Sequence, residues 1–185
     1  RGAAALQATA RLAQCVKDAV ACGDEPSRLG EAERLLRSVV AGRDALLGPD
    51  HPDSLEAANN LGTLLVTLGG REAEAEALLR RAWDGMRQAS GEANGAVLAV
   101  RSNLALALRA QGRAEEAEAE LRNVHSGLVK GVGAAHSDAL RVADALAGLL
   151  LERRAVADAV SLYRQTLSLR ELQLGEAHPD TLESA

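Results

Sequence analysis

The sequence repeats itself about every 42 residues, and this repetition restricts the possible architecture more than any other feature of the chain. A glycine recurs at intervals of 43, 42 and 42 residues, at Gly48, Gly91, Gly133 and Gly175. Seven residues after each glycine comes a leucine: Leu55, Leu98, Leu140 and Leu182. The first and last copies both contain His-Pro-Asp, in GPDHPDSL and GEAHPDTL. Repeats of this length cannot bury their apolar surface alone, so neighbouring repeats must stack.

A second segment recurs with the same period and divides each repeat into two helices. The stretch GREAEAEALLRRA at 70–82 matches GRAEEAEAELRNV at 112–124, and more distant copies lie at 27–39 and 154–166. Apolar residues in both halves of a repeat are spaced by three and four, which is typical of amphipathic helices. We expect helices near 4–22, 29–46, 53–68, 71–88, 96–111, 114–130, 138–153 and 156–173, with a ninth beginning at Asp180.

The apolar positions predict how these helices pack. Small residues recur early in the second helices, at Ala32, Ala75, Ala117 and Ala159, and in the first helices, at Gly62, Ala105 and Ala147. Large residues follow the alanines four positions later, at Leu36, Leu79, Leu121 and Tyr163. Aromatic residues make up 1% of the chain, and its apolar content of Ala, Leu and Val favours helix over sheet. The expected fold class is all-α, with antiparallel helix pairs stacked into a solenoid.

This pattern resembles the tetratricopeptide repeat, in the longer 42-residue form found in kinesin light chains. The stretch LGPDHPDSLEAANNLGTLLVTLGGREAEAEALLRRA carries the resemblance, and weaker copies cover nearly the whole chain. The resemblance implies a right-handed superhelix whose first helices line a concave groove. We expect residues 1–185 to be a single repeat array, with repeats near 4–46, 53–88, 96–130 and 138–173 and the start of a fifth at 180–185.

The resemblance also implies which residues contact a partner. In similar repeats, asparagines of the first helices hold a peptide backbone, because an amide group both donates and accepts hydrogen bonds. The matching residues here are Asn59, Asn60, Thr63, Ser102, Asn103, Arg109, Arg141 and Asp144. In the first repeat the matching positions are Ala13, Gln14 and Lys17, and in the fourth Ala145 replaces an asparagine. The second and third repeats therefore fit such a clamp best.

The start of each first helix carries a recurring polar residue. His51, His136 and His178 share one position of the repeat, and Asn94 takes that position in the remaining copy. Histidines one repeat apart are too distant to share a metal ion, so helix capping or loop packing is favoured over metal binding. Asp53 precedes Glu56 by three residues, as Asp180 precedes Glu183, which resembles a capping box with Pro52 just outside the helix.

Three further features have a structural and a functional interpretation. His125 matches the apolar residues Val40, Trp83 and Leu167, which indicates a partly buried position between helices more than a pH-sensitive switch. Trp83 is expected in the core, with a ligand platform as the alternative. The glutamate clusters of the second helices predict a solvated face that complements the helix dipole, with an acidic docking surface as the alternative. They comprise Glu72, Glu74, Glu76, Glu115, Glu116, Glu118 and Glu120.

Several function classes lack support in the sequence. No phosphate-binding loop, zinc-protease helix, hydrolase serine motif or dinucleotide fingerprint is present, so we expect neither an enzyme nor a cofactor or metal site. A net charge of −5 and a pI of about 5.4 argue against nucleic acid as a partner. No apolar run approaches the length of about 20 residues that spans a bilayer. Cys15 and Cys22 suit buried free thiols and a reducing compartment.

The function we expect is that of a non-catalytic scaffold in the cytoplasm that binds a peptide or a partner helix in its concave groove. One alternative is a structural subunit of a large cytoskeletal or ciliary assembly, which contacts its neighbours through its outer faces. Another is the regulatory repeat region of a larger signalling protein. Both ends of the sequence fall inside the repeat pattern, so we expect the chain to be a piece of a longer protein.

Overall fold

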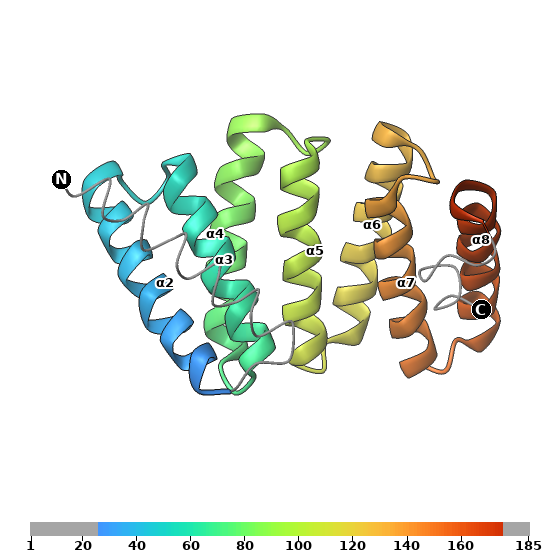
Figure 1. Ribbon diagram of the computed structural model, residues 1–185, viewed down its shortest axis with the longest axis horizontal. Helices are drawn as coiled ribbons and strands as arrows, with labels where there is room; N and C mark the ends of the chain where they lie inside the picture. The colour runs from blue at the N-terminus through green and yellow to red at the C-terminus, as the bar shows by residue number, and fades with distance from the viewer. Residues whose placement is uncertain (1–25, 176–185) are drawn as a thin grey trace. The chain divides into compact units, whose positions relative to one another are not determined.

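The computed structural model describes residues 26–175, and no strand occurs in this range (Figure 1). The helices are α2 (Pro26–Leu47), α3 (Pro52–Leu68), α4 (Glu72–Ser90), α5 (Gly95–Ala110), α6 (Ala114–Val132), α7 (Ser137–Glu152) and α8 (Val156–Leu174). Each of them was expected from the sequence, although α2 begins at Pro26 instead of residue 29 and α6 ends at Val132 instead of residue 130. The expected helices at 4–22 and from Asp180 lie outside the described residues, as do Cys15, Cys22 and His178.

The helices group into two compact units. Unit 1 comprises residues 1–91 and unit 2 comprises residues 92–185. In unit 1, α3 packs against both α2 and α4. In unit 2, α6 packs against α5 and α7, and α7 packs against α8. Helices that follow one another in sequence are therefore neighbours in space, as the short loops between them require.

The first helix of each described repeat is capped by the recurring polar residue. His51 and His136 each accept a hydrogen bond at Nδ1 from the backbone N–H two residues later, at 3.2 Å. Asn94 does the same through Oδ1, at 2.8 Å. The capping interpretation is therefore confirmed for these histidines. The capping box at Asp53 was wrong: His51 is the N-cap and Pro52 lies in the first turn, where its missing N–H costs nothing.

The second helices differ from the first helices in how their N-termini are capped. None of α4, α6 and α8 has a side-chain cap at its N-terminus. In α4, Glu72 compensates by accepting a hydrogen bond from the Gly70 N–H at 2.6 Å, and backbone N–H groups lower the pKa of this carboxylate. Each second helix of repeats two and three stops at the marker glycine. Gly91 and Gly133 have φ of 79° and 97°, a conformation that glycine adopts without strain.

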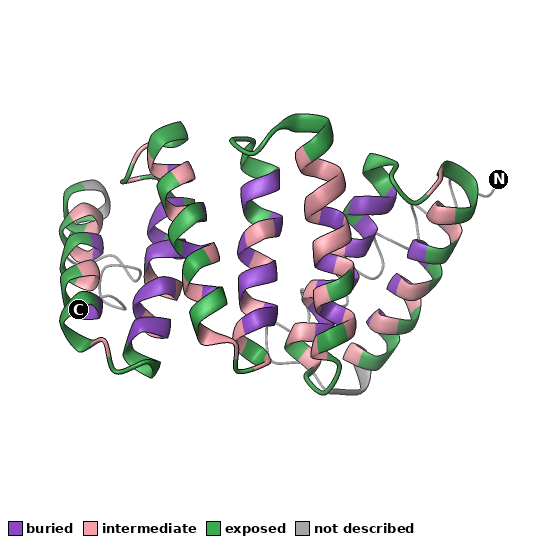
Figure 2. Ribbon diagram, turned by 180° about the vertical axis from the view of Figure 1, so that it is seen from behind, coloured by how far each residue is buried: buried purple, intermediate pink, exposed green. Residues whose placement is uncertain are grey.

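The expected apolar stripe forms the core of both units. Figure 2 shows buried positions in a band along each helix and exposed positions at the loops. Ala32, Ala75, Ala117 and Ala159 are fully buried, and Leu79 and Leu121 are equally inaccessible. Their fourth counterpart, Tyr163, is only half-buried. None of the described helices combines the length and the apolar content that a membrane span requires.

Glycines in the second helices allow two of these contacts to be close. A Cβ at Gly85 of α4 would lie 2.5 Å from Cδ1 of Leu55 in α3. A Cβ at Gly127 of α6 would lie 3.0 Å from Cδ2 of Leu98 in α5. In repeats two and three, the leucine seven residues after the marker glycine thus packs onto a bare backbone in the second helix of its own repeat, whereas Leu169 takes the glycine position in the fourth repeat.

Candidate functional site

In unit 1, the expected partner-binding residues lie together on α3. Asn59 and Asn60 are half-buried, and the Asn59 Nδ2 donates to the Asn60 Oδ1 at 3.5 Å. The Thr63 hydroxyl donates to the Asn59 carbonyl at 2.8 Å. That bond occupies the hydroxyl hydrogen, so Thr63 retains only its oxygen lone pair for an outside donor. These side chains therefore form one polar patch with both donors and acceptors.

In unit 2, the expected residues are divided between α5 and α7. Asn103 occupies the same position of the repeat as Asn60 and is also half-buried. Ser102 is only 4% exposed, so its side chain packs within the unit. Arg109 of α5 donates through Nε to Glu152 of α7 at 3.0 Å, which links the ends of two first helices. The guanidinium of Arg109 is thus already neutralised by a carboxylate.

The α7 residues differ in accessibility. The side chain of Arg141 is 62% exposed and lies 3.6 Å from Asp138, one turn earlier. Asp144 is engaged by Arg170 of α8. Ala145 stands where Asn60 and Asn103 stand in the earlier repeats, so α7 offers no amide at that position. Of the two α7 residues expected at a partner site, Arg141 is therefore the more available.

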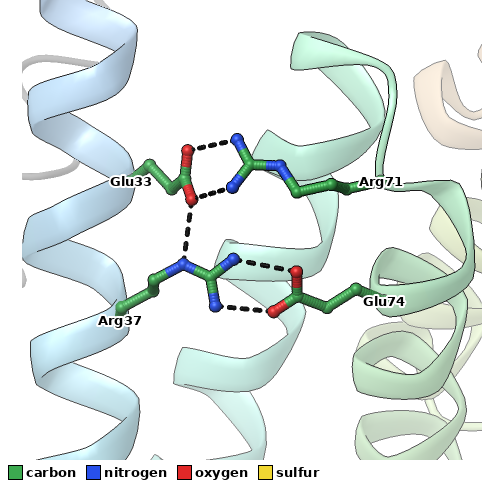
Figure 3. A network of polar contacts seen from close by, with 4 residues as sticks. All are labelled: Glu33, Arg37, Arg71 and Glu74. Atoms are coloured by element: carbon green, nitrogen blue, oxygen red, sulfur yellow. Dashed lines mark hydrogen bonds and ion pairs between the residues drawn. The ribbon is translucent and has the colours of Figure 1, made fainter.

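A network of ion pairs joins the second helices of unit 1 (Figure 3). Arg37 of α2 donates through Nε to Glu33 at 2.9 Å and through both terminal nitrogens to Glu74 of α4 at 2.6 and 2.8 Å. Arg71, at the start of α4, reaches back to the same Glu33 carboxylate. Glu33 is therefore held by two guanidinium groups, although its side chain is only 12% exposed.

The arginines lower the pKa of the carboxylates in this network. For Glu33 the largest effect is the hydrogen bond from Arg71, and the bond from Arg37 adds to it. For Glu74 the largest effect is the hydrogen bond from Arg37. These acids thus stay ionised at lower pH than a free glutamate does. The fork of Arg37 binds a carboxylate through two parallel bonds, a geometry that fixes orientation.

Unit 2 contains a related arrangement. Glu118 of α6 accepts from Arg122 at 2.9 Å, one turn later, and also from Arg153 at the α7–α8 loop. The largest single effect on the pKa of Glu118 is burial, which raises it. The two arginines together lower this pKa by more, so the net shift is downward. Six of the seven glutamates of the expected acidic face therefore have an arginine partner, although Glu115 and Glu116 remain exposed in the first turn of α6, as expected. The signal for this pairing is present in the sequence as Glu and Arg four residues apart at the same point of three repeats.

Two residues singled out in the sequence lie on the second helices. His125 is half-buried, as expected, and burial lowers the pKa of its imidazole. Trp83 is half-buried and not fully in the core, and the Arg87 guanidinium carbon lies 5.0 Å from the centre of its ring. This distance is that of a cation–π contact, so Trp83 forms part of the helix surface together with Arg87.

The described residues contain no cluster of possible metal ligands. Within residues 26–175, no group of three or more His, Cys, Asp or Glu side chains is arranged to hold a metal ion. The Nδ1 atoms of His51 and His136 accept the helix-capping hydrogen bonds, and these bonds fix the orientation of both rings.

Comparisons with known proteins agree with the repeat pattern. Two family models, both described as tetratricopeptide repeat, match the chain, one over residues 27–88 and the other over residues 97–138 and 140–180. No curated protein sequence gives a match.

Solved structures match over most of the chain. TPR-like repeats of a Podosopora anserina protein described as a putative kinesin light chain are 26% identical, with a TM-score of 0.81, over 97% of this chain and 81% of that one. A variant of those repeats with one substitution gives the same identity and coverage and a TM-score of 0.82. BtubC (BKLC) from P. vanneervenii is 18% identical over 97% of this chain and 78% of its own, with a TM-score of 0.71, and indicates the fold alone. The expected all-α solenoid is confirmed by these matches.

Proposed function

Since the chain belongs to the tetratricopeptide repeat family, whose members generally serve as protein-interaction scaffolds, we propose that it binds a peptide segment or a helix of a protein partner along its first helices. This binding is non-catalytic: the partner is held and positioned, and the surface residues supply hydrogen bonds and charge. The likeness to repeats of a kinesin light chain supports an adaptor function of this kind.

The observation that carries the proposal is the placement of Asn60 and Asn103. Both lie at the same position of consecutive repeats, on α3 and α5, and both are half-buried. A half-buried amide has its orientation limited by its neighbours, so it loses less conformational entropy when it binds a peptide group. Each amide can donate to a backbone carbonyl and accept from a backbone N–H of the partner.

The surrounding residues give the two units different chemistry. Around Asn60, the side chains of Asn59 and Thr63 are uncharged and polar. Around Asn103, unit 2 offers Arg109 with its Glu152 partner, and α7 adds Arg141 and Asp144. Ser102 is buried and therefore supports the α5 surface from within. We expect unit 1 to hold peptide backbone and unit 2 to discriminate among charged side chains.

The test is a screen of the chain against an array of peptides, followed by affinity measurements on the strongest hit. Replacing both residues, Asn60→Ala and Asn103→Ala, should weaken binding about tenfold or more, the value of one or two lost hydrogen bonds. The matched control is Asn123→Ala, which removes an exposed asparagine from the second helix α6. Thermal unfolding of each variant establishes that the fold is intact. Equal affinity of the double variant and the control would eliminate the first-helix site.

A further inference from the structure

In each unit the two second helices flank the intervening first helix, and we call the strip between them the seam. In unit 1 this seam runs between α2 and α4, above the buried Leu61 and Leu65 of α3. Three arginines bridge it, and one of them is Arg71, which reaches Glu33. Arg37 holds Glu74 through its terminal nitrogens, and Arg81 of α4 donates to Asp44 of α2 at 2.9 Å and to the Pro49 carbonyl at 2.7 Å.

The matching seam of unit 2, between α6 and α8, carries different residues at the bridging positions. Asp158 replaces Glu74, which shortens the side chain by one methylene, while Arg122 stands in the place of Arg37. The bridge between Arg81 and Asp44 also has no counterpart, because Gln165 and Val129 stand at their positions. Among the described residues, the carboxylate bonded to Arg122 is that of Glu118, on its own helix.

An open pocket of about 410 Å³ occupies this part of unit 2. Its lining residues are Arg122, His125, Leu146, Leu150, Asp158, Ser161, Leu162 and Gln165. The floor is apolar, since Leu146 and Leu150 are 5% and 3% exposed. The rim is polar, and the side chain of Arg122 is 55% exposed. Burial lowers the pKa of the His125 imidazole and so favours the uncharged ring, which can donate one hydrogen bond and accept one.

We propose that this α6–α8 pocket binds a peptide segment of a protein partner in which an acidic side chain lies next to an aliphatic one. The carboxylate binds the terminal nitrogens of Arg122, in the way that Glu74 binds Arg37 in unit 1. The aliphatic side chain covers the floor formed by Leu146, Leu150 and Leu162. In unit 1 the carboxylate on the arginine comes from Glu74 of the chain itself, whereas in unit 2 the partner supplies the carboxylate.

Two features make Arg122 suited to this role. Its Nε and Nη2 both lie against Glu118, at 2.9 and 2.7 Å, which fixes the guanidinium and leaves Nη1 and the outer hydrogen of Nη2 for a second carboxylate. Glu118 also accepts from Arg153, so it stays neutralised when the terminal nitrogens of Arg122 take a second carboxylate. Asp158 lies at the rim of the pocket, where its negative charge repels an incoming carboxylate and lowers the affinity for acidic segments.

The pocket is separate from the first-helix surface of the proposed function. Leu146 and Leu150 lie one turn apart on the buried side of α7, whereas Arg141 is on its exposed side. Variants of the pocket and variants of Asn60 and Asn103 therefore report on different sites, and one proposal can fail while the other stands.

The experiment uses two short probes, acetyl-Leu-Glu-amide and acetyl-Leu-Gln-amide, titrated into the whole chain. The ring signals of His125 in NMR spectra, assigned with His125→Gln, report on binding. We expect the Glu probe to shift these signals and to bind about tenfold more tightly than the Gln probe, since a charged hydrogen bond is lost with the latter. Equal shifts from both probes, or no shift from the Glu probe, would overturn the proposal.

Substitutions at the rim sharpen the test. Arg122→Met keeps much of the apolar stem and should abolish the preference for Glu, whereas Arg34→Met, at an exposed position of α2 in unit 1, should preserve it. Asp158→Ala should tighten binding of the Glu probe because it removes the opposing charge. Asp158→Glu restores the length of Glu74, so its carboxylate should occupy Arg122 and exclude the probe. Undiminished binding by Asp158→Glu would show that Arg122 is not the carboxylate site.

Discussion

The close contact between Gly85 and Leu55 makes a substitution at Gly85 the most direct test of the packing within a repeat. In Gly85→Ala, the new methyl group would lie 2.5 and 2.9 Å from the Leu55 methyl carbons and 3.3 Å from its Cγ. The first two distances are far inside van der Waals contact. Leu55 is only 1% exposed, so its side chain has little free space into which to move.

The magnitude follows from two opposing effects. Alanine is a better helix former than glycine by about 1 kcal/mol, which stabilises the variant. Forcing an extra methyl into a filled core costs about 1–3 kcal/mol. We therefore expect Gly85→Ala to lower the free energy of unfolding by about 1 kcal/mol. The control is Gly30→Ala in α2, where nothing lies within 4 Å of the new Cβ and the helix propensity alone should stabilise unit 1.

Urea unfolding followed by circular dichroism measures both variants, and a double-mutant cycle with Leu55→Val identifies the cause. If the methyl groups collide, shortening Leu55 should cost less in the Gly85→Ala background than in the parent chain, with a coupling of about 1 kcal/mol. Additive effects would show that the two residues do not interact. Stabilisation by Gly85→Ala equal to that by Gly30→Ala would refute the claim that the glycine is required by close packing.

Two further predictions concern caps and charges. His51→Ala should destabilise unit 1 by about 1 kcal/mol in urea unfolding through loss of the N-cap, whereas His51→Asn should retain most of the stability because Asn94 caps α5 in the same way. In the network of Figure 3, the pKa of Glu33 is lowered in the folded chain, so its stabilising effect is present above the ordinary value of 4.5 and is lost as the pH falls through the lower folded value. Glu33→Gln should therefore show a smaller fall in melting temperature than the parent chain between neutral pH and acid below 4.5, and an identical fall would exclude Glu33 as a linked group.

The repeat period predicted the helices because it carries two independent kinds of information. The apolar spacing of three and four identifies the buried face, and the marker glycine identifies where a helix stops. At Gly91 and Gly133 these agree, and α4 and α6 end one residue earlier. The cap of α3 was assigned less well, since a capping box at Asp53 was expected and His51 is the N-cap. His51 is not a typical N-cap residue, and only its alignment with Asn94 indicates that its ring nitrogen performs the same task.

The ion pairs between helices were not predicted, because sequence spacing shows only neighbours on one helix. Glu33 and Arg37 are four residues apart, and their pairing could be expected from that distance. The bond from Arg71 to Glu33 spans 38 residues and depends on how α2 and α4 are placed across α3. The same limit applies to Asp144, whose role as a partner-binding residue was expected from the family pattern and whose carboxylate is engaged by Arg170.

Equivalent positions of the repeats differ in how strongly packing restricts the residue. Core positions tolerate few changes, since Ala75, Ala117 and Ala159 must all be small to be fully buried. Positions along the seam are under no such restriction, because an arginine bridge there contributes little to stability when both side chains are partly exposed. Glu74 can therefore become Asp158 at small cost to the fold, and this change of one methylene leaves a guanidinium without its interhelical carboxylate. The repeats are thus alike where packing decides the residue, whereas residues along the seam can differ at small cost to the fold.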